Sequence, residues 1–397
     1  MNKKIFCLPF ILLSIVGCST QEGNNNTIYY EVKEEDGKRI ATVKTCEKFS
    51  KYNLVIPETV THEGNEYKVT SIKADAFKGN RYIKKVVLPD TLEFIGWDAF
   101  QECKNLEYVD LGKGIKSIGD HVFSNSKKLS TVVGGDNLKT LYKGVFEGTI
   151  VKEFNFPALE SMDIDCFWNN NKLEEVTFGA NLETISGSAF ERCSSLKKVN
   201  LSSNTKYIDN YAFKDCHSLK DISFDNLKII GISAFQNTNI EKVNIVDTKV
   251  YHSAFSNCDN LKEVYFESEE IPYKLFGNCP NISSIVLKNV ETIGSKAFYN
   301  DPLGEITIPN TVKTIGSEAF SNCQLTSLTF EEESKIESIN RRAFYQNPLE
   351  GELRIPKSVK AIYTDAFSKT KLSKIYVGDR EILKNSIAES NCEIILY

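Results

Sequence analysis

The sequence lacks the short motifs that mark the common classes of enzyme and metal protein. No CxxC pair, GxSxG elbow, GxxxxGK[ST] phosphate loop, HExxH helix or GxGxxG dinucleotide fingerprint occurs in the 397 residues. The four histidines, His62, His121, His217 and His252, fall at unrelated positions of the repeat described below. These absences argue against an enzyme, a bound cofactor and a metal site.

The chain also lacks an excess of positive charge. It carries 48 Lys and Arg against 53 Asp and Glu, a formal net charge of −5, and charges of both signs are spread evenly. No polybasic run occurs, which argues against a nucleic-acid groove and against a membrane-binding basic patch. The apolar run of residues 5–16 is too short to span a bilayer.

The sequence does contain a phenylalanine that recurs every 20–24 residues. A fixed period of this length predicts one repeat solenoid in place of two or three globular domains. The fourteen phenylalanines are Phe77, Phe100, Phe123, Phe146, Phe167, Phe190, Phe213, Phe235, Phe255, Phe276, Phe298, Phe320, Phe344 and Phe367.

Each phenylalanine has the same kinds of neighbours. An apolar residue stands five positions before it, and Asn, Cys, Ser, Thr or Asp stands three positions after it. An apolar-x-x-apolar-x-apolar run follows, such as Leu106, Val109 and Leu111, and its alternation predicts a strand of a parallel sheet. The short polar side chain is expected to bond turn backbone. A positive-φ turn is expected in the units with a glycine four before the Phe: Gly96, Gly119, Gly231, Gly294 and Gly316.

The repeat register also accounts for most of the eleven cysteines. Cys166 occupies the small-residue position before Phe167. Among the residues after Cys18, only Cys46 and Cys392 lie outside the array. Cysteine is a small, weakly polar and often buried residue, so we expect most of these to be buried free thiols. The six cysteines at the turn position are Cys103, Cys193, Cys216, Cys258, Cys279 and Cys323.

The repeat resembles the BspA-like leucine-rich repeat family of bacterial surface proteins. The motif TIGSEAFSNC at residues 314–323, preceded by ITIPNTVK, carries the resemblance, and residues 53–77 resemble the family's entry into its first repeat. The resemblance implies about fourteen coils with a parallel sheet on one face and short turns or helical turns on the other. It also implies a non-enzymatic adhesion or protein-binding module, with partners on host or neighbouring cells.

The ends of the chain complete the expected organisation. Residues 15–18 resemble a bacterial lipobox, which implies cleavage before Cys18, lipid attachment to it, and a place at the bacterial outer membrane or cell surface. An ordinary secretory signal is the alternative. The expected parts are a lipoprotein signal peptide (1–17), a polar tether (18–27), an N-terminal β-hairpin cap (28–68), the leucine-rich repeat array (69–377) and a C-terminal cap (378–397).

The outward strand positions hold the candidate ligand-binding residues. Tyr265 with Lys242, Asn244 and Glu263 is the main candidate, because an exposed tyrosine beside charged and amide groups suits contact with a protein or a carbohydrate. Tyr108 with Asp110, and Tyr376, are weaker candidates. The competing interpretation is structural: Lys198, Asp221, Lys242 and Glu263 alternate in sign, as cross-strand pairs would. A glycan-binding accessory lipoprotein for nutrient capture is the alternative function.

Overall fold

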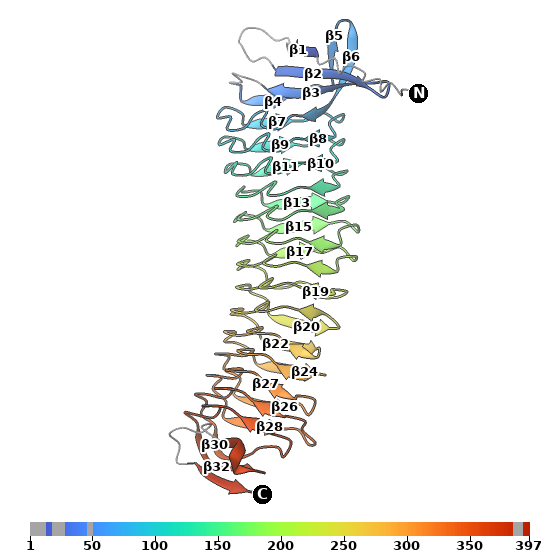
Figure 1. The fold of residues 1–397 in the computed structure, drawn as a ribbon. Helices are drawn as coiled ribbons and strands as arrows, with labels where there is room; N and C mark the ends of the chain where they lie inside the picture. Colours follow the sequence, from blue (N-terminus) through green and yellow to red (C-terminus); the bar gives the residue numbers. More distant parts are fainter. Residues whose placement is uncertain (1–12, 18–27, 46–50, 384–391) are drawn as a thin grey trace, which may run out of the picture. The chain divides into compact units, whose positions relative to one another are not determined.

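A computed structural model describes residues 13–17, 28–45, 51–383 and 392–397, in two compact units, Met1–Leu182 and Glu183–Tyr397. Each unit is a stack of short coils joined by parallel strand pairing (Figure 1). The predicted leucine-rich-repeat solenoid of about fourteen coils is confirmed. Helix is almost absent, since the described residues contain one 3-10 helix, η1 (Arg380–Leu383).

The recurring phenylalanines form a continuous ring stack inside each unit. From Phe77 to Phe167, neighbouring ring centroids lie 5.1–5.7 Å apart and are within 12° of parallel. From Phe190 to Phe367 the spacing is 5.3–5.9 Å. Backbone bonds run beside the rings: the Phe320 N–H donates to the Ala343 carbonyl of the next coil at 2.8 Å. Buried offset stacking of this kind fixes the spacing between coils.

The longer strand of each coil follows the phenylalanine, and we call this the long-strand side. Its strands pair in parallel and alternate buried and exposed side chains, as predicted. In the first unit they are β4 (Asn53–Val55), β7 (Lys85–Val87), β9 (Tyr108–Asp110), β11 (Thr131–Val133), β13 (Glu153–Phe156) and β15 (Glu175–Phe178). In the second unit they are β17 (Lys198–Asn200), β20 (Lys242–Val246), β22 (Glu263–Glu267), β24 (Ser284–Lys288), β26 (Glu305–Ile308), β28 (Ser327–Phe330), β30 (Glu350–Arg354) and β32 (Lys371–Val377).

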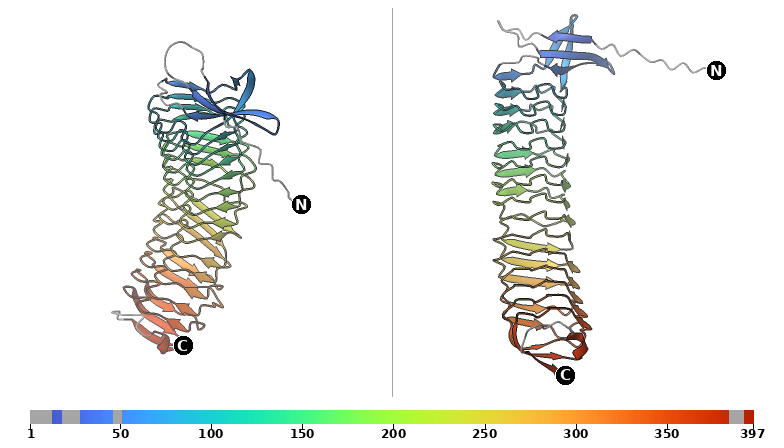
Figure 2. Two further views of the ribbon diagram at one scale, coloured as in Figure 1. Left: turned by 45° about the horizontal axis from the view of Figure 1, so that its top comes forward. Right: turned by 60° about the vertical axis from the view of Figure 1, so that its left-hand side comes forward.

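A second set of strands, two residues each, lies on another side of the coils (Figure 2). Each ends at the apolar residue five before the phenylalanine, so this side carries short parallel pairs where turns or helical turns were expected. In the first unit they are β8 (Phe94–Ile95), β10 (Ser117–Ile118), β12 (Thr140–Leu141) and β14 (Ser161–Met162). In the second they are β16 (Thr184–Ile185), β18 (Tyr207–Ile208), β19 (Ile229–Ile230), β21 (Lys249–Val250), β23 (Glu270–Ile271), β25 (Thr292–Ile293), β27 (Thr314–Ile315), β29 (Ser338–Ile339) and β31 (Ala361–Ile362).

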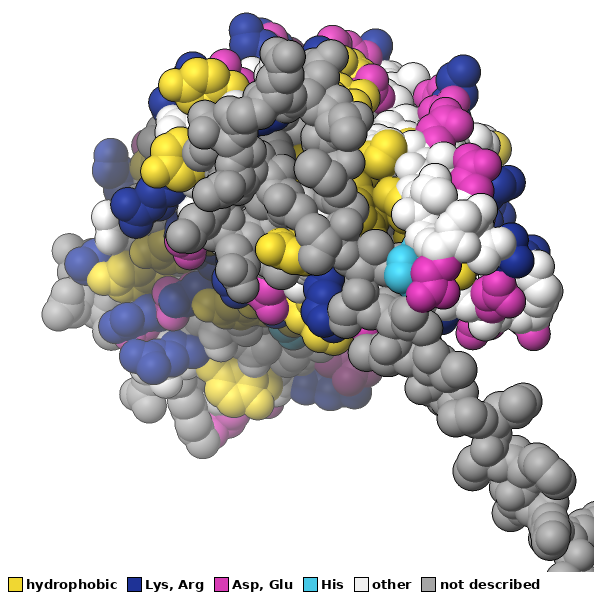
Figure 3. All heavy atoms as spheres, turned by 90° about the horizontal axis from the view of Figure 1, so that it is seen from above, with side chains coloured by type: hydrophobic (Ala, Val, Ile, Leu, Met, Phe, Trp, Pro, Cys, Tyr) yellow, Lys and Arg dark blue, Asp and Glu magenta, His cyan; other side chains and the backbone are white. Residues whose placement is uncertain are grey.

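Two antiparallel hairpins cover the N-terminal end. The predicted hairpin consists of β2 (Ile28–Glu35) and β3 (Lys38–Thr45), and β5 (Thr59–His62) with β6 (Asn65–Ile72) forms a second one that the sequence did not suggest. The end of the predicted signal peptide forms β1 (Leu13–Gly17), which pairs with β2. Cys18 and the tether lie outside the described residues. Seen from this end, charged side chains of both signs are exposed (Figure 3).

The C-terminal cap follows the predicted order in part. After β32, the 3-10 helix η1 stands where a short amphipathic helix was expected, and β33 (Glu393–Leu396) pairs in parallel with β32. Residues 384–391, between these elements, lie outside the described residues.

The role predicted for the repeat glycines is wrong. No left-handed φ occurs at the five glycines, and a Cβ at Gly316 would lie 2.5 Å from the Ser295 backbone nitrogen. These glycines therefore allow close approach of the preceding coil. The left-handed residues lie two before and two after the phenylalanine, as at Glu318 (φ 57°) and Asn322 (φ 58°).

The expected strand after Phe213 is also missing. Residues 221–224 form no strand, although the Phe224 ring still packs edge-on against Phe235 and Phe255 with centroids 5.5 Å apart. Asp221 therefore has no place in a charge ladder. The cross-strand pair of Lys242 with Glu263 is present, with their charged groups 2.9 Å apart.

The turn position behaves as predicted. The Cys323 thiol donates to the Phe298 carbonyl at 2.9 Å, and the Cys103 thiol donates to the Phe77 carbonyl at 3.2 Å. Burial raises the pKa of Cys103 to about 12, so its thiol stays protonated and keeps this donor. Seven of the eight cysteines in the described chain are buried, and all eight are free; Cys392 is half-buried.

Candidate functional site

The main candidate residues come together on three neighbouring strands of the second unit. Strands β20, β22 and β24 pair in register, which places Lys242 opposite Glu263 and Asn244 opposite Tyr265. Val243, Ile245, Val264 and Phe266, between them, point into the core. We call the outward side chains of these strands the β20–β24 face: Lys242, Asn244, Val246, Glu263, Tyr265, Glu267, Ser284, Val286 and Lys288.

Tyr265 is held at the centre of this face, half-buried where an exposed ring was predicted. Its hydroxyl donates to Glu267 Oε2 at 2.8 Å, and the Lys288 ammonium lies 6.0 Å from the ring centroid. Hydrogen bonding to Tyr265, with the charges of Tyr265 and Glu267, raises the pKa of Lys288 above its ordinary value. The ring is therefore pre-oriented, and a partner that contacts it finds little side-chain freedom left to lose.

Two valines extend the apolar centre of the face. Val246 and Val286 are each 46% exposed, and Val286 stands directly beside Tyr265 in the register. Val246, Glu267 and Lys288 were not predicted as candidates, because only two outward positions per strand were considered. The continued alternation of apolar and polar residues along β20, β22 and β24 was the available signal.

A cleft borders the β20–β24 face. In the described chain no backbone hydrogen bond joins β24 to β26, because β26 pairs only with β28. The break leaves a cleft of about 470 Å³. Its exposed lining is mostly hydroxyl, with Ser284 on one side and Thr307 and Thr329 in mutual contact on the other at 2.8 Å. Glu305 supplies its carboxylate.

The weaker candidates lie elsewhere. Tyr108 and Asp110 belong to β9 in the first unit, where the Lys85 ammonium lies 4.6 Å from the Tyr108 ring and Asp110 accepts the Gly112 N–H. Tyr376 belongs to the β30–β32–β33 sheet of the second unit, so it shares no sheet with Tyr265. It contacts Glu352 at 3.0 Å.

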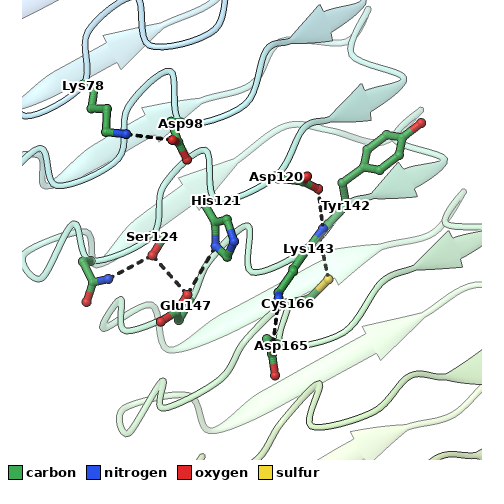
Figure 4. A network of polar contacts seen from close by, with 11 residues as sticks. Lys78, Asp98, Asp120, His121, Ser124, Tyr142, Lys143, Glu147, Asp165 and Cys166 are labelled. Carbon is green, nitrogen blue, oxygen red and sulfur yellow. Dashed lines mark hydrogen bonds and ion pairs between the residues drawn. The ribbon is translucent and has the colours of Figure 1, made fainter.

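A polar network in the first unit contains serine, histidine and glutamate (Figure 4). Ser124 Oγ donates to Glu147 Oε2 at 3.2 Å, and His121 Nδ1 lies 3.4 Å from the same oxygen. Both groups therefore approach the carboxylate, whereas a nucleophilic triad needs a bond between serine and histidine. Gly144 gives the imidazole its place, because a Cβ there would lie 2.4 Å from His121 Nδ1. The network ties coils together.

Among the residues that the structure describes, no group of three or more His, Cys, Asp or Glu side chains could hold a metal ion. None of the described helical structure could cross a lipid bilayer.

One buried carboxyl stands out at the turn position. Asp301 is fully buried; its Oδ1 accepts the Cys279 N–H at 2.6 Å, and its Oδ2 has no hydrogen-bond partner. Burial raises the pKa of Asp301 well above its usual range. Asn347 fills the same position two coils later, and its amide nitrogen donates to the Phe320 and Phe344 carbonyls. An amide therefore satisfies a site where a carboxylate leaves one oxygen unpaired.

Comparison with known proteins shows the family. The sequence profile of the BspA type leucine rich repeat region matches residues 59–171, 158–262 and 269–393. The chain therefore belongs to the BspA-type leucine-rich repeat family. Membership indicates a protein-binding or adhesion-type module. No curated protein matches the chain in a sequence search.

One solved structure supports the fold, and a second shows a weaker likeness. A leucine-rich repeat protein from Bacteroides ovatus ATCC 8483 is similar, with 26% identity, a TM-score of 0.82, and coverage of 95% of this chain and 100% of that chain. A leucine rich cell surface protein from Faecalibacterium prausnitzii A2-165 has 21% identity and a TM-score of 0.44, over 92% of this chain and 93% of that one.

Asp301→Asn should stabilise the protein at neutral pH by roughly 1–3 kcal/mol, because the amide replaces a buried carboxyl with an unpaired oxygen. The folded-state pKa of Asp301 is raised, so the wild-type protein loses stability as pH rises through that pKa. The gain should therefore shrink towards pH ~4, near the pKa of an unfolded aspartate. Urea unfolding at several pH values measures it.

The matched control reverses the exchange. Asn347→Asp should destabilise at pH 7 and recover part of that loss in acid. Equal stability of Asp301→Asn and wild type at pH 7 would contradict the account of the turn position.

Proposed function

We propose that this chain is a non-enzymatic, lipid-anchored adhesion module that binds protein partners on host or neighbouring cells through the β20–β24 face. The observation that carries this proposal is an apolar centre made of the exposed Val246 and Val286 and the half-buried ring of Tyr265 on one sheet. Charged side chains frame this centre, including the Lys242–Glu263 pair. An apolar centre with a polar rim is the usual anatomy of a protein-binding surface.

The tyrosine contacts favour a protein over a glycan as the ligand of this face. Sugars stack on open aromatic rings, but cations lie over Tyr108, Tyr265 and Tyr376. Tyr265 and Tyr376 also belong to different sheets. The glycan-binding alternative, an accessory lipoprotein for nutrient capture, draws its support from the hydroxyl-lined cleft beside the face.

The lipid anchor is the second part of the proposal. The leader resembles a lipoprotein signal, and cleavage before Cys18 would remove Leu13–Gly17 and with it strand β1. The mature folded chain would then begin with the β2–β3 hairpin, tethered at the bacterial outer membrane or cell surface. Stable attachment requires more than one acyl chain.

Cys18→Ala should abolish membrane attachment, because the acyl chains have no other proposed site. Fractionation of expressing cells, with metabolic labelling by a fatty acid, measures this. The wild-type protein should carry label and pellet with membranes, and protease shaving of intact cells should cleave it. The proposed lipid anchor at Cys18 would be contradicted if the wild-type protein carried no label, or if Cys18→Ala carried as much label as the wild type.

The double variant Tyr265→Ala/Lys242→Ala tests the β20–β24 face. Beads coated with residues 28–397 should adhere to epithelial cells or neighbouring bacteria, and the variant should lose most of this adhesion with a nearly unchanged melting temperature. A matched control, Tyr273→Ala/Lys249→Ala, removes an exposed tyrosine and an exposed lysine of strand β21, both outside the face. Equal adhesion by wild type and the double variant would exclude the face as the binding site.

A further inference from the structure

A groove of about 970 Å³ lies in the first unit and includes no residue of the β20–β24 face. Its roof is the tip of the β2–β3 hairpin, residues 34–40, which extends sideways beyond the coils beneath it (Figure 1). Its floor crosses four successive coils at one repeat position, nine before the phenylalanine. That position holds small or short side chains, Thr91, Gly114, Asn137 and Ala158. The repeat itself thus forms a channel along the stack.

The groove is cationic in an acidic protein. Six lysines and arginines but only four carboxylates line it, whereas the whole chain has a net charge of −5. The cations come from the hairpin, from β6 and from the coils. They are Lys38, Arg39, Lys68, Lys113, Lys116 and Lys139.

Three of these cations are satisfied within the protein. Arg39 pairs with Glu34 at 2.6 Å, Lys116 with Glu93 at 2.8 Å, and Lys139 with Glu160 at 2.8 Å. Lys38, Lys68 and Lys113 make no ion pair with any described residue, yet all three are exposed and line the same groove. Three unpaired ammonium groups from three different elements form an anion-binding set.

The rest of the lining describes the ligand. The groove has no aromatic side chain, so neither base stacking nor sugar stacking can operate there. Two further carboxylates face it: Glu66, which makes no ion pair with a described residue, and Asp90, whose Oδ1 accepts the Lys113 backbone N–H at 2.9 Å. These carboxylates would repel a densely charged phosphate backbone, but they can accept hydrogen bonds from hydroxyl groups. A ligand with spaced anionic groups and many hydroxyls meets both demands.

We propose that this groove binds a linear acidic polysaccharide, one that carries carboxylate or sulfate groups. Lys38, Lys68 and Lys113 bind the anionic groups. Glu66 and Asp90 accept hydrogen bonds from the hydroxyl groups of the sugar. With coils about 4.8 Å apart, the four-coil floor is roughly 14 Å long, enough for a few sugar units. This site is independent of the β20–β24 face.

The test measures binding of residues 28–397 to dextran sulfate of low substitution and to polygalacturonate, which separate sulfate from carboxylate recognition. Dextran, single-stranded DNA and anionic phospholipid vesicles serve as comparison probes. The groove variant Lys38→Ala/Lys68→Ala/Lys113→Ala should lose about tenfold or more in affinity for the preferred polysaccharide, since three ionic contacts vanish. Raising the salt from ~50 to ~300 mM should weaken wild-type binding more than variant binding.

A control with the same change in net charge isolates the groove. Lys104→Ala/Lys127→Ala/Lys172→Ala removes three exposed lysines of the first unit that lie outside the groove and should bind like wild type. Tyr265→Ala/Lys242→Ala should also keep its polysaccharide binding. The proposal is overturned if both triple variants bind equally, if neither polysaccharide binds, or if DNA or vesicles bind more tightly than both.

Discussion

The fold depends on one contact between coils, the backbone hydrogen bond that a recurring phenylalanine donates to the coil that follows; it is present from Phe77 to Phe146 and from Phe190 to Phe344. The Phe100 N–H donates to the Val122 carbonyl at 3.0 Å, and the Phe213 N–H donates to the Ala234 carbonyl at 2.8 Å. These bonds lie where no regular strand forms. Together with the stacked rings, they impose a common coil height on each unit.

Other residue choices follow from that height. Several donors at the turn position bond the carbonyl of the preceding coil's phenylalanine, among them the Cys216 thiol, the Ser126 hydroxyl and the Asn347 amide, whereas the Thr149 hydroxyl donates to Phe146 of its own coil. Glycine at the position after the apolar residue lets the coils approach. Asn278, Asn300 and Asn322 form a side-chain ladder beside them. The interior side chains thus have structural roles, and specific binding is left to side chains on the outer surface.

The sequence predicted the parts of the molecule that repeat. The phenylalanine register, the buried cysteines and the hairpin at residues 28–45 all follow from local patterns, and the structure has them. Sheet continuity was not predictable, because residues 221–224 and the break between β24 and β26 depend on how neighbouring coils align. The spacing of the phenylalanines predicts which side chains lie inside a coil. It contains little information on which strands of neighbouring coils pair.

The candidate surfaces show the same division. Tyr265, Lys242, Asn244 and Glu263 were found from the alternation of a strand, and the structure brings them together. The groove under the β2–β3 hairpin joins residues 34–40 to coils up to residue 158. No pattern in the sequence relates those segments. A regular scaffold can therefore carry distinct binding sites wherever a cap or a sheet break interrupts it.

Hydrogen exchange at the backbone amides of the recurring phenylalanines tests most directly whether the hydrogen bonds of these amides hold neighbouring coils together. The recurring phenylalanine amides from Phe77 to Phe146 and from Phe190 to Phe344 are expected to exchange as slowly as buried strand amides of the same unit, such as those of Val243 and Ile245, since each donates to the next coil. Rapid exchange at the phenylalanine amides, with the strand amides still protected, would contradict this role of the hydrogen bonds.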